Sequence, residues 1–150
     1  MTAPQLPQGF LSGIRIIDLS WKTVGPWGAR MATPYGAEVI HIEPPGRPDD
    51  HRFDARPTVS DATKEQEEWH GQPWRPAENT TPYYTTPYFS QLHAGKLAIN
   101  LNVRAPEGMR LLERLIEKSD ALCENFSGTV LDSWGLDWER LQSLNPKIVY

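Results

Sequence analysis

Short runs of branched apolar residues alternate with amphipathic segments along this chain, as in proteins built on a parallel α/β sheet. Apolar runs predict strands at 14–19, 38–43, 97–101 and 121–124, and the start of another at 147–150. Helix signals fall between them, at 27–35, 106–120, 129–134 and 137–144. Because strands and helices alternate through short connections, we predict parallel strands joined by right-handed crossovers.

The first strand–helix–strand unit, from Ile14 to Gly46, predicts where a ligand would bind. Gly25-Pro26 breaks the chain after the first strand, and Pro26 suits the first turn of a helix because the N–H it lacks has no partner there. Pro34 is expected to kink or shorten that helix. Ligands of parallel sheets bind beyond the carboxyl ends of the strands, which places residues 20–26 and 44–47 at the mouth of a site.

Residues 47–87 interrupt this alternation. The stretch is polar, rich in proline and without a steady period, which predicts a long loop or insertion in the domain. Loops of this length in compact domains are usually functional lids or mobile segments.

Composition and charge narrow the class of protein. The 150 residues carry a net charge of −4 and contain no basic run, so nucleic acid is not an expected partner. No apolar stretch approaches the ~20 residues needed to span a bilayer, and the amino terminus lacks the core of a secretory signal. We therefore predict a cytoplasmic protein without a membrane segment.

The single Cys123 forms no internal disulfide, and a buried, inert thiol is the expected state.

Few residues point to chemistry by themselves. Asp18, near the end of the first strand, is compatible with a nucleophile or base, but the simpler interpretation is that it accepts hydrogen bonds from the following turn. The four histidines show no ligand spacing to another histidine, to the cysteine or to a carboxylate on one element, so no metal site is predicted. Motifs for a nucleophile elbow, a P-loop and a dinucleotide fingerprint are absent.

Two further positions suit a ligand at the carboxyl edge of the sheet. Arg104 follows the strand at 97–101 and could meet an anion there, or it is a solvated surface residue. Asn125-Phe126 pairs an amide with an aromatic plane, a combination that either binds a base or anchors a loop. From the residues alone, a ligand-binding α/β domain is indicated.

Six segments in order resemble the class III CoA-transferase family, to which formyl-CoA transferase and carnitine CoA-transferase belong. They are LSGIRIIDLS, GP, YGAEVIHIEPPG, YFSQLHAGKLAINLN, PEGMRLLERLIEKSDALCENF and VLDSWGLDWERLQSLNPKIVY. The resemblance covers nearly the whole chain outside 47–87, where this sequence is longer than the usual connection. It implies a Rossmann-like large domain and a smaller one, so that residues 1–150 would be the amino-terminal part of the large, CoA-binding α/β domain.

The same resemblance implies an activity. Members move CoA from an acyl-CoA to a carboxylate acceptor, and an aspartate attacks the thioester and passes through mixed-anhydride and aspartyl-CoA intermediates. That aspartate lies well downstream of the strand beginning at Lys147, so no catalytic residue is assigned within 1–150. The resemblance also implies that CoA and acyl-CoA are substrates rather than a permanent cofactor, and that two full-length subunits interlock as a homodimer.

Carried over by position, the resemblance predicts seven CoA-binding residues: Thr23, Val24, Leu101, Asn102, Arg104, Asn125 and Phe126. Thr23 and Val24 fall where the family's backbone holds CoA, and Arg104 would meet a phosphate as a charge-assisted partner. The sequence departs from the family at three places: Pro44 and Ser133 stand where some members carry basic contacts, and Ser127-Gly128-Thr129 replaces the commoner Arg-Pro-Gly. Fewer cations predict weaker or differently arranged phosphate binding.

Two alternatives stay open. An acyl-CoA racemase of the same superfamily would bind CoA and shuttle a proton with a His/Asp pair. Asn125 favours transfer, because racemases tend to carry EGY or EGF where this chain has Glu124-Asn125-Phe126. The second alternative is a non-catalytic CoA-binding half that pairs with another polypeptide. A parallel strand normally continues into a loop, so the end at Tyr150 predicts a fragment. Because the resemblance places the nucleophile downstream, this fragment is not expected to turn over alone.

Overall fold

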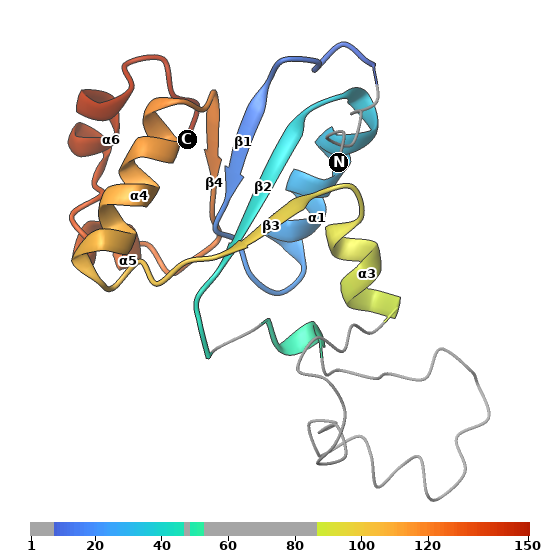
Figure 1. Ribbon diagram of the computed structural model, residues 1–150, viewed down its shortest axis with the longest axis horizontal. Coiled ribbons are helices and arrows are strands. Elements are labelled where there is room, and N and C mark those ends of the chain that lie inside the picture. The colour runs from blue at the N-terminus through green and yellow to red at the C-terminus, as the bar shows by residue number, and fades with distance from the viewer. Residues whose placement is uncertain (1–7, 47–48, 53–86) are drawn as a thin grey trace, which may run out of the picture.

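Four parallel strands form the centre of the computed structural model, which describes residues 8–46, 49–52 and 87–150 (Figure 1). Their order across the sheet is β3-β2-β1-β4. The middle strands are β1 (Arg15–Asp18) and β2 (Glu38–Glu43), and the edges are β3 (Leu97–Asn100) and β4 (Ala121–Cys123). All three pairings are parallel, so the predicted α/β class with a parallel sheet and flanking helices is confirmed.

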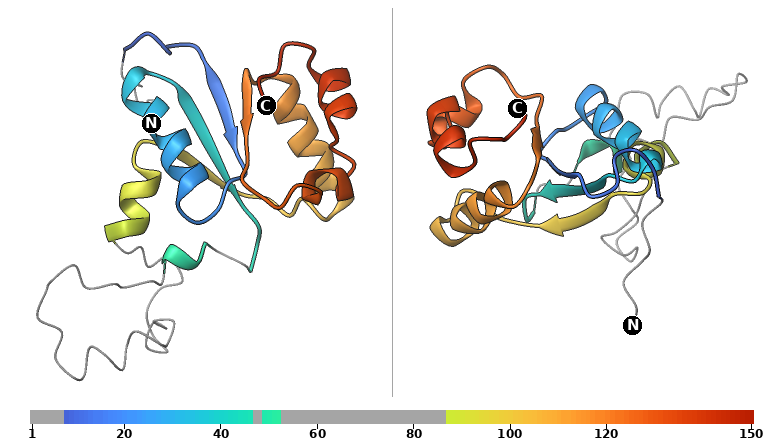
Figure 2. Two further views of the ribbon diagram at one scale, coloured as in Figure 1. Left: turned by 180° about the vertical axis from the view of Figure 1, so that it is seen from behind. Right: turned by 90° about the horizontal axis from the view of Figure 1, so that it is seen from above.

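Helices lie on both faces of the sheet (Figure 2). On one face lie α1 (Val24–Ala32), which continues into the 3-10 turn η1 (Thr33–Tyr35), and α3 (Pro87–His93), which contacts the 3-10 turn η2 (Asp50–Arg52). On the other face lies α4 (Pro106–Glu117), accompanied by the short helices α5 (Val130–Ser133) and α6 (Trp138–Leu144). None of the described helices is both long enough and apolar enough to cross a membrane.

Each face of the sheet carries its own hydrophobic core. Ile17 of β1 packs towards α4, where Leu112 and Ile116 are fully buried. On the opposite face a smaller core joins Ala29 of α1 to Val39 of β2. Fully burying a leucine or isoleucine side chain stabilises a fold by about 2 kcal/mol, so α4 contributes more to stability than α1.

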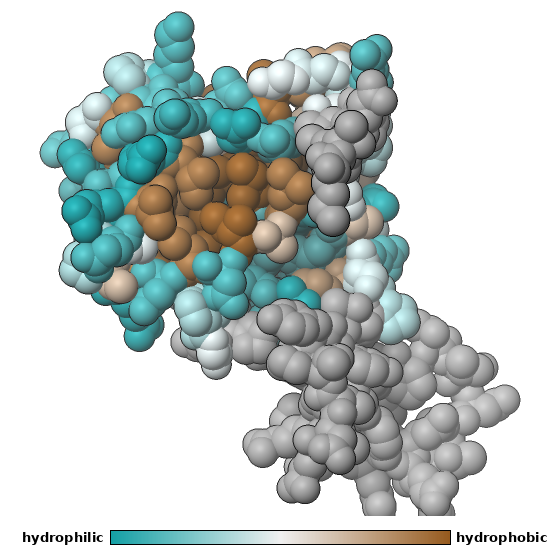
Figure 3. Space-filling view, viewed as in Figure 1, coloured by the Kyte–Doolittle hydropathy of each residue, from teal (hydrophilic) through white to brown (hydrophobic). Residues whose placement is uncertain are grey.

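The part of the sheet formed by β2 and β3 is open on the α4 side among the described residues. Leu97 and Ile99 of β3 are in register with Ile40 and Ile42 of β2, so these four side chains share one face. Leu97 and Ile99 are 40% and 37% exposed. Figure 3 shows the apolar surface that results between α4 and β3.

The first helix differs from its predicted bounds at both ends. It begins at Val24 rather than at Trp27, so that Pro26 lies in its first turn as expected. Its α-helical part ends at Ala32, and Pro34 lies in the tighter turn η1. Proline cannot donate the hydrogen bond that would extend an α-helix, which explains why this helix is short, as the sequence predicted.

Later elements are also shorter than predicted. The helix starting at Pro106 ends at Glu117 rather than at 120, because Asp120 already pairs with the backbone of Arg15 beside β4. Of the predicted strand at 147–150, only Val149 pairs with the sheet, as an isolated parallel bridge to Ala121 of β4. The other strands match their predictions to within one residue at each end.

The predicted loop or insertion at 47–87 contains two ordered pieces that its sequence pattern does not indicate. The turn η2 occupies residues 50–52, and α3 begins at Pro87. Residues 53–86 lie outside the described part of the chain.

Candidate functional site

The carboxyl ends of the parallel strands lie at one edge of the sheet, and the predicted site residues follow them. Thr23 and Val24 come after β1, Leu101 comes after β3 and Asn125 comes after β4. The connection after β1 leads to α1 on one face, whereas the connection after β4 leads to α5, whose Leu131 belongs to the core on the other face. Parallel α/β sheets bind ligands where the connections of neighbouring strands diverge in this way.

The side chain of Asn125 ties these two diverging connections together. Its Nδ2 donates to the carbonyl oxygen of Trp21 at 2.8 Å, and its Oδ1 accepts from the N–H of Trp21 at 2.8 Å. Gly25 passes so close that a Cβ there would lie 2.3 Å from Cβ of Ser20 and 3.1 Å from Cγ of Asn125. Only glycine fits at position 25 without displacing this contact, and Asn125 has the loop-anchoring role that was one of its two predicted roles.

Thr23 and Val24 lie at the exposed start of α1. The hydroxyl of Thr23 lies 3.1 Å from the hydroxyl of Tyr88 in α3 and 3.4 Å from Nε2 of His51 in η2. Val24 is 79% exposed. The turn that is predicted to contact CoA is therefore open on its outer side and supported by η2 and α3 on its inner side.

Leu101, Asn102 and Arg104 belong to the segment that joins β3 to α4 across the strand ends (Figure 1). The N–H of Leu101 donates to the carbonyl oxygen of Glu43 at 2.9 Å, and Val103 is buried in the larger core. Oδ1 of Asn102 accepts from the N–H of Arg104 at 3.1 Å, and both residues are exposed. A fixed backbone thus carries the side chain of Arg104 at the surface.

Phe126 is half-buried at the opposite end of the same edge. Its ring packs on the larger core and meets Trp134 edge-on, with ring centroids 5.3 Å apart. β3 and β4 are the outermost strands of the sheet. Their carboxyl ends are therefore separated by three interstrand spacings, about 14 Å. The seven predicted residues therefore lie along one edge of the sheet rather than in one closed cavity.

A surface pocket of about 540 Å³ lies on the α1 side of β1 and β4, and the seven predicted residues do not line it. Its lining includes Cys123, Glu124 and Tyr150. Burial raises the pKa of the Cys123 thiol, in keeping with the predicted inert thiol, although the residue is only half-buried. Oε1 of Glu124 accepts from the hydroxyl of Tyr150 at 2.8 Å, and burial together with this carboxylate raises the pKa of Tyr150 to about 12.

A buried ion pair lies beneath the carboxyl edge, at the end of β1. Nζ of Lys96 lies 2.7 Å from Oδ2 of Asp18 and donates to the carbonyl oxygen of Pro26 at 2.8 Å. The other oxygen of Asp18 accepts from the N–H of Ser20 at 3.0 Å and from its hydroxyl. Burial alone would raise the pKa of the Asp18 carboxyl, but His41 and Lys96 outweigh it and hold that pKa well below its usual range. The predicted role of Asp18 as acceptor for the following turn is confirmed.

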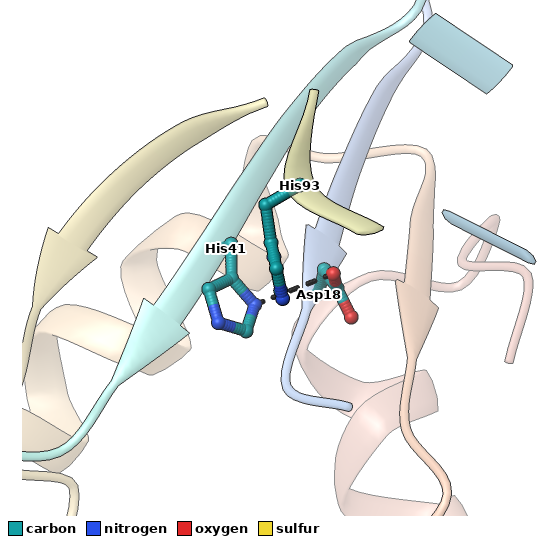
Figure 4. Close-up of side chains that lie close together, drawn as sticks. All are labelled: Asp18, His41 and His93. Carbon is teal, nitrogen blue, oxygen red and sulfur yellow. Dashed lines mark ion pairs between the residues drawn. The ribbon is translucent and has the colours of Figure 1, made fainter. Parts of the chain in front are cut away.

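Two histidines adjoin this ion pair (Figure 4). Nδ1 of His41 lies 3.3 Å from Oδ2 of Asp18, and its Nε2 lies 3.7 Å from Oε1 of Glu43. The ring of His93 lies against that of His41, with centroids 4.3 Å apart, and stacks on Phe89 at 4.2 Å. Burial and the nearby charge of His41 lower the pKa of His93 to about 3, so His93 is neutral.

A second ion pair, between Arg52 and Glu43, lies next to these residues on the side of β2. Together with Asp18, Lys96 and the two histidines, it forms one cluster. Nη2 and Nε of Arg52 donate to the two carboxylate oxygens of Glu43 at 2.9 and 3.0 Å, and the guanidinium lies over the ring of Phe89, 3.9 Å from its centroid. Burial raises the pKa of Glu43, but His41 and Arg52 outweigh burial and lower that pKa to about 2. Paired charges of this kind are costly to break when buried, by about 3–5 kcal/mol for loss of one partner.

Three side chains of this cluster have donor atoms spaced closely enough to suggest a metal site. One ligand atom each from Asp18, His41 and His93 lies within 4.8 Å of the others. However, Lys96 already holds Oδ2 of Asp18, so a divalent ion would lie beside a buried ammonium group. We therefore interpret the cluster as a network of ion pairs.

Sequence reasoning missed this cluster because it judged the histidines by spacing within one element. The three residues come from β1, β2 and α3 instead. One signal was available: Asp18 and His41 both lie near the ends of predicted strands, and the two are direct partners in the register of the sheet.

Comparison with known proteins places the chain in a family. Residues 11–150 match the family model described as CoA-transferase family III. The chain is 35% identical over 140 residues to succinate–glutarate CoA-transferase of Agrobacterium fabrum, and 34% identical over 139 residues to formyl-CoA:oxalate CoA-transferase of Rhodopseudomonas palustris. Each alignment covers 93% of this chain, but 31% and 27% of the respective relative. The chain thus spans less than a third of the length of these curated relatives.

Solved structures have the same fold. A CAIB/BAIF family protein from Brucella suis superposes with a TM-score of 0.72 at 31% identity, over 95% of this chain and 32% of that one. A protein from Mycobacterium tuberculosis superposes with a TM-score of 0.71 over 97% of this chain and 32% of that one, and its 21% identity supports the fold alone. Since the family model matches nearly all of the sequence, this chain belongs to CoA-transferase family III.

Proposed function

We propose that this protein, at full length, transfers coenzyme A from an acyl-CoA to a carboxylate acceptor. Residues 1–150 would be the amino-terminal part of its large CoA-binding domain, followed by a second, smaller domain. The observation that carries the proposal is the match of residues 11–150 to CoA-transferase family III, together with relatives that are named as CoA-transferases. These relatives are about three times longer, which supports assigning only part of the active site to this chain.

CoA would bind along the carboxyl edge of the sheet. It is a long molecule with a nucleotide, phosphates and a pantetheine arm, so it suits a row of residues better than a closed cavity. Thr23 and Val24 would contact it through the exposed backbone at the start of α1, and Arg104 would pair with a phosphate. Phe126, with Asn125 beside it, would lie near the nucleotide. Leu101 and Asn102 would complete the edge next to Arg104.

Catalysis would use an aspartate beyond residue 150. Its carboxylate would attack the thioester carbonyl carbon and release CoA thiolate, leaving a mixed anhydride. The thiolate would then attack the aspartyl carbonyl and release the first carboxylate, which leaves an aspartyl-CoA thioester for the acceptor. Asp18 does not suit this role, because it is fully buried and both of its oxygens are engaged. No residue of this chain is assigned as catalytic.

The proposal extends to the assembly and its surroundings. Two full-length subunits would interlock as a homodimer, and the enzyme would act in the cytoplasm on an acyl-CoA and a free carboxylic acid, without nucleic acid or a membrane. CoA would be a substrate and not a permanently bound cofactor.

An acyl-CoA racemase is the second candidate, and Asn125-Phe126 in place of the racemase pattern favours transfer over it.

The direct test is an exchange assay on the full-length protein. Succinyl-CoA with glutarate and formyl-CoA with oxalate are the first pairs, taken from the names of the two relatives. We expect a new CoA thioester, and hydroxylamine should convert one aspartate beyond residue 150 to a hydroxamate that mass spectrometry locates. Absence of both exchange and adduct across a panel of acyl-CoAs would contradict transfer. Deuterium entering the α-carbon without CoA exchange would identify a racemase instead.

A further inference from the structure

His41 is buried, and each of its ring nitrogens lies near a carboxylate; Figure 4 shows it beside Asp18. Nδ1 is 3.3 Å from Asp18 and Nε2 is 3.7 Å from Glu43, and the residue is 1% exposed. Neither nitrogen has a hydrogen-bond partner among the described residues. Each nitrogen therefore lies beside a carboxylate without a hydrogen bond of good geometry.

The geometry favours a proton on each nitrogen. A neutral imidazole carries one N–H, so its other nitrogen would direct a lone pair at a carboxylate. Only the imidazolium presents N–H groups on both sides.

The groups facing His41 come from four places in the fold. They are Asp18 on β1, Glu43 on β2, the neutral His93 on α3 and Lys96 in the turn before β3. Burial lowers the pKa of His41 and Lys96 opposes its protonation, but the contacts with Asp18 and Glu43 outweigh both and hold the pKa above its ordinary value of 6.5. Arg52 lies on the far side of Glu43 and is paired with it.

Asp18 connects His41 to the turn after β1. One oxygen of Asp18 holds Ser20 at the beginning of this turn, and the other holds Lys96, which in turn holds the carbonyl oxygen of Pro26 at its end. Thr23 and Val24, the predicted CoA-binding residues at the start of α1, lie between these attachment points. The position of one carboxylate thus fixes both ends of the predicted CoA-binding turn.

We propose that His41, as an imidazolium, is a positioning residue for coenzyme A: it holds Asp18 in place and thereby fixes the turn after β1 against which CoA binds. The identity of the ligand rests on the proposed function. When the proton is lost, a lone pair replaces an N–H against one carboxylate, and the turn loses support. Because the pKa of His41 is raised, the effect is fully present below pH 6.5 and is lost as the pH rises through the pKa of His41 in the folded protein.

Two substitutions at position 41 test this in the full-length protein. His41→Gln removes the charge, and His41→Lys keeps a cation that does not titrate near neutrality. Calorimetry with CoA between pH 6 and 9 should show that the wild-type Kd rises with pH and that His41→Gln binds about 2- to 30-fold more weakly at pH 6. His41→Lys should bind tightly and keep only the pH dependence that comes from the titration of CoA itself, for which it is the control. Equal binding by His41→Gln, or a profile for His41→Lys as steep as that of the wild type, would overturn the proposal.

A readout without CoA separates this proposal from the proposed function. Nuclear magnetic resonance of ring-labelled histidine should show His41 of the wild-type protein doubly protonated at neutral pH, and amide exchange at residues 20–26 should accelerate as it deprotonates. If the wild-type protein does not bind CoA at any pH, the proposed function fails, while these measurements still decide the role of His41. A neutral His41 that binds Zn²⁺ together with His93 would overturn the positioning role, because metals bind neutral imidazole.

Discussion

At the scale of single residues, cationic side chains that pair with a carboxylate differ from unpaired ones in whether they are available to a ligand. Lys96 and Arg52 are largely buried and each is held by a carboxylate, so they are committed to the structure. Arg104 is exposed at the carboxyl edge, and its guanidinium has no ion-pair or hydrogen-bond partner in the part of the chain that the structure describes. An arginine in this state is available to a phosphate, which it binds through two parallel N–H groups.

We therefore expect Arg104→Ala to weaken CoA binding to the full-length protein by about 1–3 kcal/mol, or about 5- to 150-fold in Kd. Isothermal titration calorimetry measures this directly. Arg110→Ala is the matched control, since Arg110 is an exposed arginine on α4 that already pairs with Glu107 at 3.2 Å. An unchanged Kd for Arg104→Ala would show that this residue is only part of the surface.

Residue roles set by local sequence were predictable, and those set by tertiary contacts were not. Asp18 accepts from a residue two positions later, which a strand followed by a turn already indicates. Its partner Lys96 is 78 residues away in the chain, and no pattern within one element identifies such a pair. The same limit applies to His41 and His93, which only the packing of α3 onto the sheet brings together.

At the scale of elements, the start of α1 is the most tightly constrained feature of the candidate site. Gly25 allows the helix to approach Ser20 and Asn125, whereas Gly28, one turn later, has no atoms within 4 Å of the place where a Cβ would lie. The same residue type thus has opposite consequences within one nine-residue helix. The sequence predicted a break at Gly25-Pro26, but it could not show that the break is also a close contact with the end of β4.

Gly25→Ala should destabilise the protein by about 1–3 kcal/mol, because the added methyl group must displace Ser20 or Asn125. Gly28→Ala should stabilise it by up to about 1 kcal/mol, since alanine has the higher helix propensity and meets open space. Urea unfolding followed by circular dichroism compares the two variants. A similar effect from both substitutions would be inconsistent with the close approach at position 25.

At the scale of the whole molecule, the sheet is covered unevenly. The alternation of strands and helices predicted the parallel sheet, since it depends only on periodicity along the chain. The order β3-β2-β1-β4 and the open face of β3 depend on how the elements are assembled, which periodicity does not determine. The shared apolar face is buried at Ile42 and partly open at its register partner Ile99.

In the 150-residue chain, Ile42→Ala should lower the free energy of unfolding by about 2–5 kcal/mol and Ile99→Ala by only about 1 kcal/mol. The difference arises because Ile42 is 2% exposed and Ile99 is 37% exposed. Denaturant titration measures both, and equal losses would contradict the open face. In a longer natural chain, a larger loss from Ile99→Ala would indicate that additional residues cover β3.

The order of the strands has a consequence for synthesis on the ribosome. The backbone of Arg15, at the start of the central strand β1, pairs with Asp120, 105 residues later in the chain. At roughly 5–20 residues per second, translation of that interval takes about 5–20 seconds. Throughout this time the nascent polypeptide has one side of its central strand unpaired. Its yield in cells should therefore depend on chaperones that shield apolar segments until β4 has emerged.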